Sequence, residues 1–121
     1  MKQKYKILIV DDSITSRKIL KNILIENGHE VIGEAINGKD AVSKYKELQP
    51  DITTMDITMP VMDGLEALKE IMEIDKHAKV VMVTAAGQKS KMVDAVKYGA
   101  VEFLTKPFEA EQITEIIERI I

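Results

Sequence analysis

The sequence predicts a doubly wound α/β fold with a five-stranded parallel sheet. Five short apolar runs of strand length recur along the chain, and segments with the apolar spacing of a helix separate them. No linker rich in proline, glycine or serine interrupts this alternation. Strict alternation of strands and helices requires crossover connections, and right-handed crossovers lay the strands parallel with helices on both faces of the sheet.

The strands are predicted at runs rich in β-branched and other apolar residues. Several runs are apolar almost throughout, which indicates burial on both faces of the sheet. In chain order they are residues 6–10, 30–35, 51–55, 79–83 and 101–105.

The helices are predicted between the strands, where apolar residues recur at three- and four-residue spacing. Gly28 follows the first helix as a C-terminal stop signal. Asn37-Gly38 and Asp63-Gly64 are typical of turns into the second and third helices, where Asn or Asp caps the helix and Gly tolerates a positive φ. The apolar positions are Leu20, Ile23 and Leu24; Ala41, Val42 and Tyr45; Leu65, Leu68, Ile71 and Met72; Met92, Val93 and Val96; Ile113, Ile116, Ile117 and Ile120.

The size and composition of the chain limit its function. Its 121 residues suffice for one core, so we expect one domain over residues 1–121. A net charge of -3 argues against direct binding of nucleic acid. Because cysteine is absent, disulfides and thiolate metal sites are excluded. The apolar runs are too short for a membrane span or a signal peptide, and we expect a cytoplasmic protein without membrane insertion.

Polar residues stand where the predicted strands end. Asp11 and Asp12 follow the first strand, Asp56 the third, Thr84 the fourth and Lys106 the fifth. Each residue alone is also typical of a turn or a helix cap. Doubly wound sheets bind ligands at the carboxyl ends of their strands, so we expect these residues to converge.

Three carboxylates at one edge raise one another's pKa unless a cation lies among them. Carboxylate oxygens without His or Cys suit a hard ion, so Mg²⁺ is the predicted cofactor, with Mn²⁺ as a substitute. An Asp can be a nucleophile toward phosphorus. In that reaction Lys106 and the Thr84 hydroxyl each suit an oxygen of the phosphoryl group.

Four segments carry a resemblance to a known family. They are ILIVDDS at 7–13, DITMPVMDG at 56–64, VTA at 83–85 and TKPF at 105–108. The chain thereby resembles the response regulator receiver family over nearly its whole length. The resemblance implies a flavodoxin-like receiver fold, and within the family the chain is most similar to stand-alone chemotaxis regulators.

The resemblance also implies a role for each site residue. Asp56 is the phosphoacceptor, Asp12 and Asp56 bind Mg²⁺ directly, and Asp11 acts largely through water. The backbone carbonyl of Thr58 is a further Mg²⁺ ligand. Thr84 and Lys106 bind the phosphoryl group, and the peptide bond between Lys106 and Pro107 is cis.

The family implies a switch as well. Thr84 moves toward the phosphoryl group, Phe103 turns into the space behind it, and the surface of residues 91–98 and 101–120 is the readout. The positions that tune hydrolysis, Thr58 and Ala86, carry neither an acid nor an amide. We therefore expect intrinsic dephosphorylation without a built-in accelerator, a separate phosphatase as a further partner, and no enzyme activity beyond the protein's own phosphorylation and dephosphorylation.

The partners implied are a sensor histidine kinase as phosphodonor and a downstream protein target, the flagellar motor switch if the pathway is chemotaxis. We expect a monomer. The alternatives within the family are a receiver cut from a larger transcription factor and a phosphorelay intermediate. Outside the family they are a Mg²⁺-dependent phosphohydrolase that works through an aspartyl phosphate, and a flavodoxin-like binding module without phosphotransfer.

Overall fold

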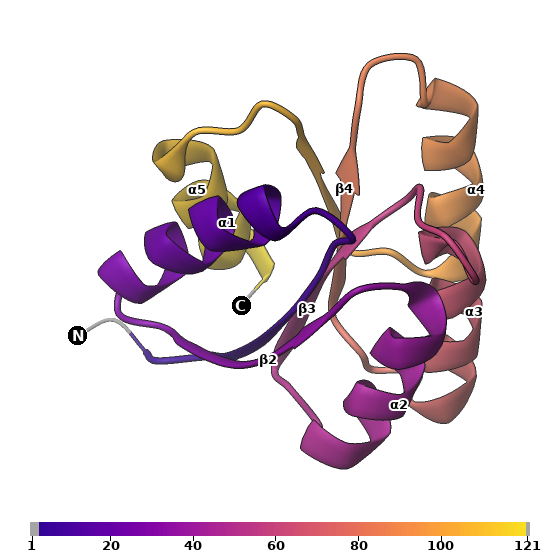
Figure 1. The fold of residues 1–121 in the computed structure, drawn as a ribbon, viewed down its shortest axis with the longest axis horizontal. Helices are drawn as coiled ribbons and strands as arrows, with labels where there is room; N and C mark the ends of the chain where they lie inside the picture. The colour runs from indigo at the N-terminus through magenta and orange to yellow at the C-terminus, as the bar shows by residue number, and fades with distance from the viewer. Residues whose placement is uncertain (1–2, 121) are drawn as a thin grey trace.

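The computed structural model describes residues 3–120, which form a single sheet layer between two layers of helices (Figure 1). Residues 1, 2 and 121 of the predicted domain lie outside the described residues. The elements alternate strictly, as predicted. They are β1 (Lys6–Val10), α1 (Ile14–Glu26), β2 (Glu30–Ala35), α2 (Gly38–Leu48), β3 (Ile52–Asp56), α3 (Gly64–Ile74), β4 (Val80–Thr84), α4 (Lys89–Tyr98), β5 (Glu102–Thr105) and α5 (Ala110–Ile120).

The sheet has the strand order β2-β1-β3-β4-β5, and every neighbouring pair is parallel. Helices α1 and α5 cover one face, and α2, α3 and α4 cover the other (Figure 1). The predicted doubly wound fold is therefore confirmed. The strand order reverses next to β1, which places the carboxyl ends of β1 and β3 at the point where such sheets bind ligands.

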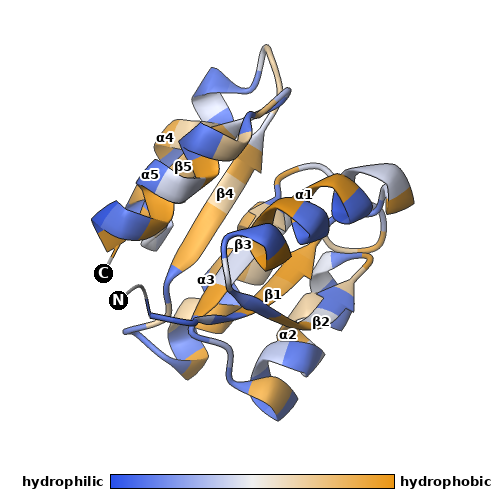
Figure 2. Cartoon of the chain, turned by 90° about the vertical axis from the view of Figure 1, so that its left-hand side faces the viewer, coloured by the Kyte–Doolittle hydropathy of each residue, from blue (hydrophilic) through white to orange (hydrophobic). Residues whose placement is uncertain are grey.

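The central strands are buried on both faces, as their continuous apolar runs predicted. On β1, Ile7 and Ile9 pack under α1 and α5, whereas Leu8 and Val10 pack under α2 and α3. Figure 2 shows the same concentration of apolar residues along β1 and β4. Among residues 3–120, no helix is long and apolar enough to cross a bilayer.

The predicted bounds of three strands are wrong by one residue. The third and fourth strands begin and end one residue later than predicted, and the fifth begins one residue later. The cause is the parallel ladder, in which Asp56 pairs with Val83 and Thr84 pairs with Thr105. Pairing with neighbours thus carries two polar site residues into the ends of their strands.

The turn residues confirm the predicted caps but correct the role of two glycines. Asn37 and Asp63 each accept a hydrogen bond from the first turn of their helix. Gly28 follows α1 with a φ of +89°, as its stop role predicted. Gly38 and Gly64, however, do not have a positive φ. Among residues 3–120, the non-glycine residues with a positive φ are Gln49 and Val61.

Gly64 is required instead for a close backbone approach. Its N–H donates to the carbonyl of Ile57 at 2.7 Å. A Cβ at this position would lie 2.0 Å from the carbonyl oxygen of Asp56. The start of α3 is thereby pressed against the end of β3, which fixes the backbone that carries Asp56.

Candidate functional site

Three acidic side chains meet at the carboxyl ends of β1 and β3. Val10 pairs with Met55 across the two strands, so Asp11 and Asp56 leave the sheet side by side. One carboxylate oxygen from each of Asp11, Asp12 and Asp56 lies within 4.8 Å of the others. Asp11 is buried, Asp56 is half-buried and Asp12 is exposed. The predicted convergence of the acids is confirmed.

Lys106 reaches the same cluster from the end of β5. Its Nζ lies 2.9 Å from Oδ2 of Asp11 and 3.6 Å from Oδ2 of Asp56. The backbone N–H of Lys106 donates to the carbonyl of Thr84 at 2.8 Å, which holds the end of β5 against β4. The bond between Lys106 and Pro107 is cis, as predicted.

The electrostatics of the cluster are those of confined like charges. Burial raises the pKa of Asp56 to about 6; the charge of Lys106 opposes this rise, and the charges of Asp11 and Asp12 add to it. Burial alone would lower the pKa of Lys106, but its hydrogen bond to Asp11 and its attraction to Asp56 raise it overall. The ammonium group of Lys106 therefore contacts two of the three clustered carboxylates.

The donor set fits a hard divalent cation. All three clustered side chains offer carboxylate oxygens, and no His or Cys belongs to this cluster of described residues. Mg²⁺ binds through a small number of carboxylates and keeps several waters. Asp11, Asp12 and Asp56 are thus the residues that could hold Mg²⁺, at a site open enough at Asp12 for those waters.

Thr84, Thr58 and Phe103 do not belong to the acidic cluster, although Thr84 ends β4 and Thr58 follows β3 closely. Thr84 is buried, and its hydroxyl lies 3.5 Å from that of Thr105, a weak contact at the limit of a hydrogen bond. Thr58 follows the end of β3 and is exposed. Phe103 is half-buried and packs against the core under α2, α3 and α4.

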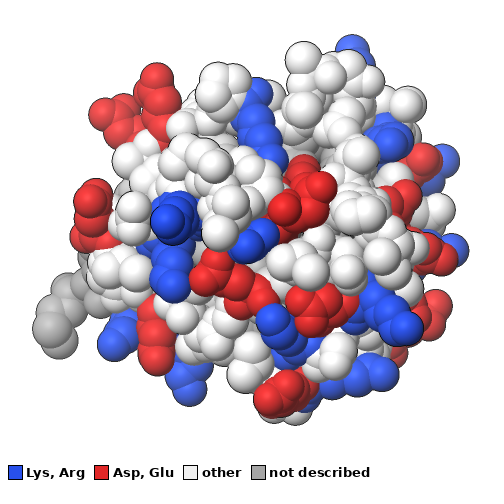
Figure 3. Space-filling model, viewed as in Figure 1, with Lys and Arg blue, Asp and Glu red and all other residues white. Residues whose placement is uncertain are grey.

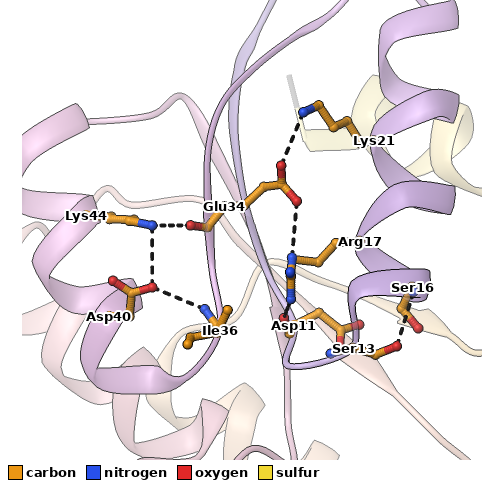
Figure 4. Close-up of polar contacts among 9 residues, drawn as sticks. All are labelled: Asp11, Ser13, Ser16, Arg17, Lys21, Glu34, Ile36, Asp40 and Lys44. Carbon is orange, nitrogen blue, oxygen red and sulfur yellow. Dashed lines mark hydrogen bonds and ion pairs between the residues drawn. The ribbon is translucent and has the colours of Figure 1, made fainter.

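A charged network behind the acidic loop was not predicted from the sequence. Arg17 of α1 donates to the backbone carbonyl of Asp11 at 2.7 Å and pairs with Glu34 at 3.1 Å. Lys21 pairs with the other oxygen of Glu34 at 3.2 Å, and Figure 4 shows both cations pointing toward this strand residue. Burial opposes ionisation of Glu34, but the hydrogen bonds and charges of Lys21 and Arg17 lower its pKa.

The same network extends to α2 on the other side of β2. Lys44 donates to the backbone carbonyl of Glu34 and pairs with Asp40 at 3.4 Å, while Asp40 accepts from the N–H of Ile36 at 3.2 Å (Figure 4). These contacts occupy the edge of the sheet next to the acidic loop. The sequence signal for these contacts is an acidic residue on β2 opposite basic residues of α1. To recognise it, one has to know the register of β2 on β1.

Gln88 is a second residue that sequence reasoning missed. Its Oε1 accepts from the backbone N–H of Ala85 at 2.6 Å, and its Nε2 donates to the hydroxyl of Thr58 at 2.8 Å. Neither position 58 nor position 86 carries an amide side chain, yet the fold brings the amide of Gln88 onto Thr58. One sequence signal pointed to Gln88. It precedes the fourth helix at the position where Ser, Thr, Asp or Asn usually caps a helix.

Surface charge is mixed on the face that carries α1, α2 and the strand ends. Figure 3 shows Lys and Arg interspersed with Asp and Glu over this face. They do not gather there into the broad basic patch that nucleic acid binding requires.

Comparisons with known proteins agree with this geometry. The response regulator receiver domain family matches residues 7–118. The chain is 52% identical over 115 residues to the chemotaxis protein CheY of Bacillus subtilis, covering 95% of this chain and 96% of that relative. It is 50% identical over 115 residues to the chemotaxis protein CheY of Thermotoga maritima, with the same coverage. A chain in the crystal structure of the CheX-CheY-BeF3-Mg+2 complex from Borrelia burgdorferi has a TM-score of 0.92 and 39% identity, covering 96% of this chain and 88% of that one.

Proposed function

Because this chain belongs to the response regulator receiver domain family of two-component systems, we propose that it accepts a phosphoryl group on Asp56. The observation that carries the proposal is the cluster itself. Asp56 lies within 4.8 Å of two further carboxylates and 3.6 Å from the Lys106 ammonium. A phosphoacceptor needs such a nearby positive charge, because negative charge builds up on the phosphoryl oxygens during transfer.

In the proposed transfer, an Oδ of Asp56 forms a bond to phosphorus while the bond between phosphorus and the donor histidine nitrogen breaks. The electron pair stays on that imidazole nitrogen, and Lys106 offsets the charge on the transferred oxygens. Asp11, Asp12, Asp56 and the backbone carbonyl of Thr58 would hold Mg²⁺, or Mn²⁺ in its place. When bound, this ion supplies positive charge to the carboxylates and to the phosphoryl oxygens.

Thr84 and Phe103 are proposed as the switch. The Thr84 hydroxyl has only a long contact with Thr105 to give up, and Ala85 next to it is small and exposed. A phosphoryl oxygen at Asp56 offers this hydroxyl a charged acceptor, which is a stronger partner. Movement of Thr84 would leave space for Phe103 and change the surface of α4, β5 and α5.

The pathway we propose is chemotaxis, in line with the names of the relatives that are about half identical over nearly the whole chain. A sensor histidine kinase is the proposed donor, and its use of cytoplasmic ATP favours a cytoplasmic location for this protein. The flagellar motor switch is the proposed target, and a separate phosphatase the proposed terminator. We propose that residues 1–121 act as one monomeric receiver domain whose only chemistry is its own phosphorylation and dephosphorylation. The comparisons do not favour an excised receiver or a phosphorelay intermediate.

The test is uptake of radiolabelled phosphate from a small acyl phosphate. The parent protein should be labelled in the presence of Mg²⁺, and Asp56→Asn should not. A chelator should abolish labelling, and added Mn²⁺ should restore it. Equal labelling of parent and Asp56→Asn, or labelling that survives the chelator, would falsify the proposal.

A further inference from the structure

The side chain of Gln88 joins the two loops on either side of the proposed phosphorylation site. Its amide oxygen accepts from the N–H of Ala85 at 2.6 Å, directly after Thr84. Its amide nitrogen donates to the hydroxyl of Thr58 at 2.8 Å, two residues after Asp56. One carboxamide thus ties the loop after β4 to the loop after β3.

This use of Gln88 is not explained by capping of its helix. Gln88 stands at the N-cap of α4, yet its side chain makes no hydrogen bond to the first turn. Ser13, Asn37 and Asp63, at the N-caps of α1, α2 and α3, each accept a hydrogen bond from their own helix. Gln88 makes no such bond to the first turn of α4. Both the oxygen and the nitrogen of its amide bind loop residues instead.

We propose that Gln88 is a positioning residue that latches the β4–α4 loop in its unphosphorylated arrangement. The inference rests on the proposed phosphorylation of Asp56. For the Thr84 hydroxyl to reach a phosphoryl oxygen, the backbone after Thr84 has to shift relative to Thr58. Because the amide is held at both ends, that shift breaks at least one of its two hydrogen bonds, and the latch opposes activation.

The size of the effect follows from the net strength of such bonds. Loss of one or two hydrogen bonds on a partly exposed side chain changes a two-state equilibrium by about threefold to tenfold. Removal of the latch should therefore tighten the binding of a phosphoryl mimic that selects the active arrangement, by about the same factor.

The experiment compares Gln88→Ala with the parent protein. Amide NMR spectra at saturating Mg²⁺ give the beryllofluoride concentration that half-converts Thr84 and Ala85 to the bound state. Gln88→Ala should be half-converted at a concentration about threefold to tenfold lower. The matched control is Gln3→Ala, since Gln3 is exposed ahead of β1, lies outside the readout surface and accepts from the hydroxyl of Tyr5 at 2.5 Å. The control should titrate like the parent.

A second variant tests the other end of the latch. Thr58→Val removes the hydroxyl that accepts from Gln88 and keeps the branched shape, whereas Thr58→Ser retains the hydroxyl. Gln88→Ala combined with Thr58→Val should bind the mimic no more tightly than Thr58→Val alone. Thr58→Val already breaks the latch, so the second substitution has no further latch to remove. With Thr58→Ser, Gln88→Ala should keep its full effect.

The outcomes separate the latch from the proposed function. If the parent does not respond to beryllofluoride with Mg²⁺, the proposed phosphorylation is wrong. If the parent responds and Gln88→Ala is half-converted at the same or a higher concentration, the latch is wrong. An unchanged titration together with slower loss of phosphate from Asp56 also overturns the latch, because the amide would then act on the hydrolytic water.

Discussion

The ammonium nitrogen of Lys106 lies 2.9 Å from Oδ2 of Asp11, closer than its 3.6 Å distance from the proposed phosphoacceptor. The nearest counter-ion of Lys106 is therefore Asp11, a proposed metal ligand, and not Asp56. A cation that binds the carboxylates and this ammonium group repel each other, while both attract the phosphoryl oxygens. Loss of Lys106 should consequently change the affinity for Mg²⁺ and the rate of phosphate uptake in opposite directions.

We expect Lys106→Met to bind Mg²⁺ more tightly and to accept phosphate more slowly. Loss of a positive charge beside the carboxylates should raise the affinity for Mg²⁺ by about threefold to tenfold at low ionic strength. Loss of a donor to the transferred oxygens should slow labelling by at least about tenfold. Calorimetric Mg²⁺ titration and labelling rates measure both effects. Lys46→Met, which alters an exposed Lys at the far end of α2, is the control, and weaker Mg²⁺ binding by Lys106→Met would contradict the prediction.

We expect protonation of Asp56 to stabilise the metal-free protein at acid pH, and we expect this contribution to be lost as the pH rises from about 4 to about 6. Burial and the neighbouring acids raise the pKa of Asp56 to about 6, so in this range the folded protein binds a proton that the unfolded chain has released. The contribution is complete below about pH 4 and lost above about pH 6. Asp56→Asn should not show this pH-dependent loss of stability, because Asn does not titrate.

At neutral pH and with a chelator present, Asp56→Asn should be more stable than the parent by about 1–2 kcal/mol. This is less than the pKa shift alone would give, because Lys106 loses an ion pair. Urea unfolding of both proteins across the pH range measures the difference. A difference that does not grow between acid and neutral pH would show that Asp56 is not destabilised by its charge.

We expect Arg17→Met to weaken both the fold and the acidic loop. Arg17 is mostly buried, and it donates to the Asp11 carbonyl and to Glu34 (Figure 4). Its loss leaves two acceptor atoms, the Asp11 carbonyl oxygen and Oε1 of Glu34, without their charged donor, while Lys21 still pairs with Oε2 of Glu34. This should cost about 2 kcal/mol of unfolding free energy and weaken Mg²⁺ binding several-fold. Lys21→Met is the matched control, since Lys21 contacts the same Glu34 from a more exposed position and should cost about 0.5 kcal/mol or less. Equal losses in the two variants would sink this account.

We expect Gly64→Ala to destabilise the protein by at least about 2–3 kcal/mol, because its Cβ would lie 2.0 Å from the Asp56 carbonyl oxygen and backbone atoms have to move. The displaced end of β3 should also slow phosphate uptake. Gly28→Ala is the control: its φ is +89° but a Cβ there meets nothing within 4 Å, so the cost should stay at about 1 kcal/mol. Urea unfolding distinguishes the two, and a Gly64→Ala protein as stable as Gly28→Ala would contradict the close approach.

The alternation of apolar runs determined the fold without any further information. Two periodicities in strict succession allow few arrangements other than a doubly wound sheet, and parallel strands end at a common edge. For this reason Asp11, Asp56 and Lys106 could be placed together although they are far apart in the chain. Their roles, and those of Thr58, Thr84 and Phe103, stay predictions.

Only the tertiary structure decided how side chains outside the motifs meet. Arg17 and Glu34 come together through the register of β2 on β1, and Gln88 meets Thr58 through the conformation of two loops. The close approach of Gly64 to Asp56 likewise replaced the positive φ that its sequence context indicated. Periodicity fixes which face of an element is buried, whereas polar contacts between loops depend on backbone angles and rotamers that have no period in the sequence.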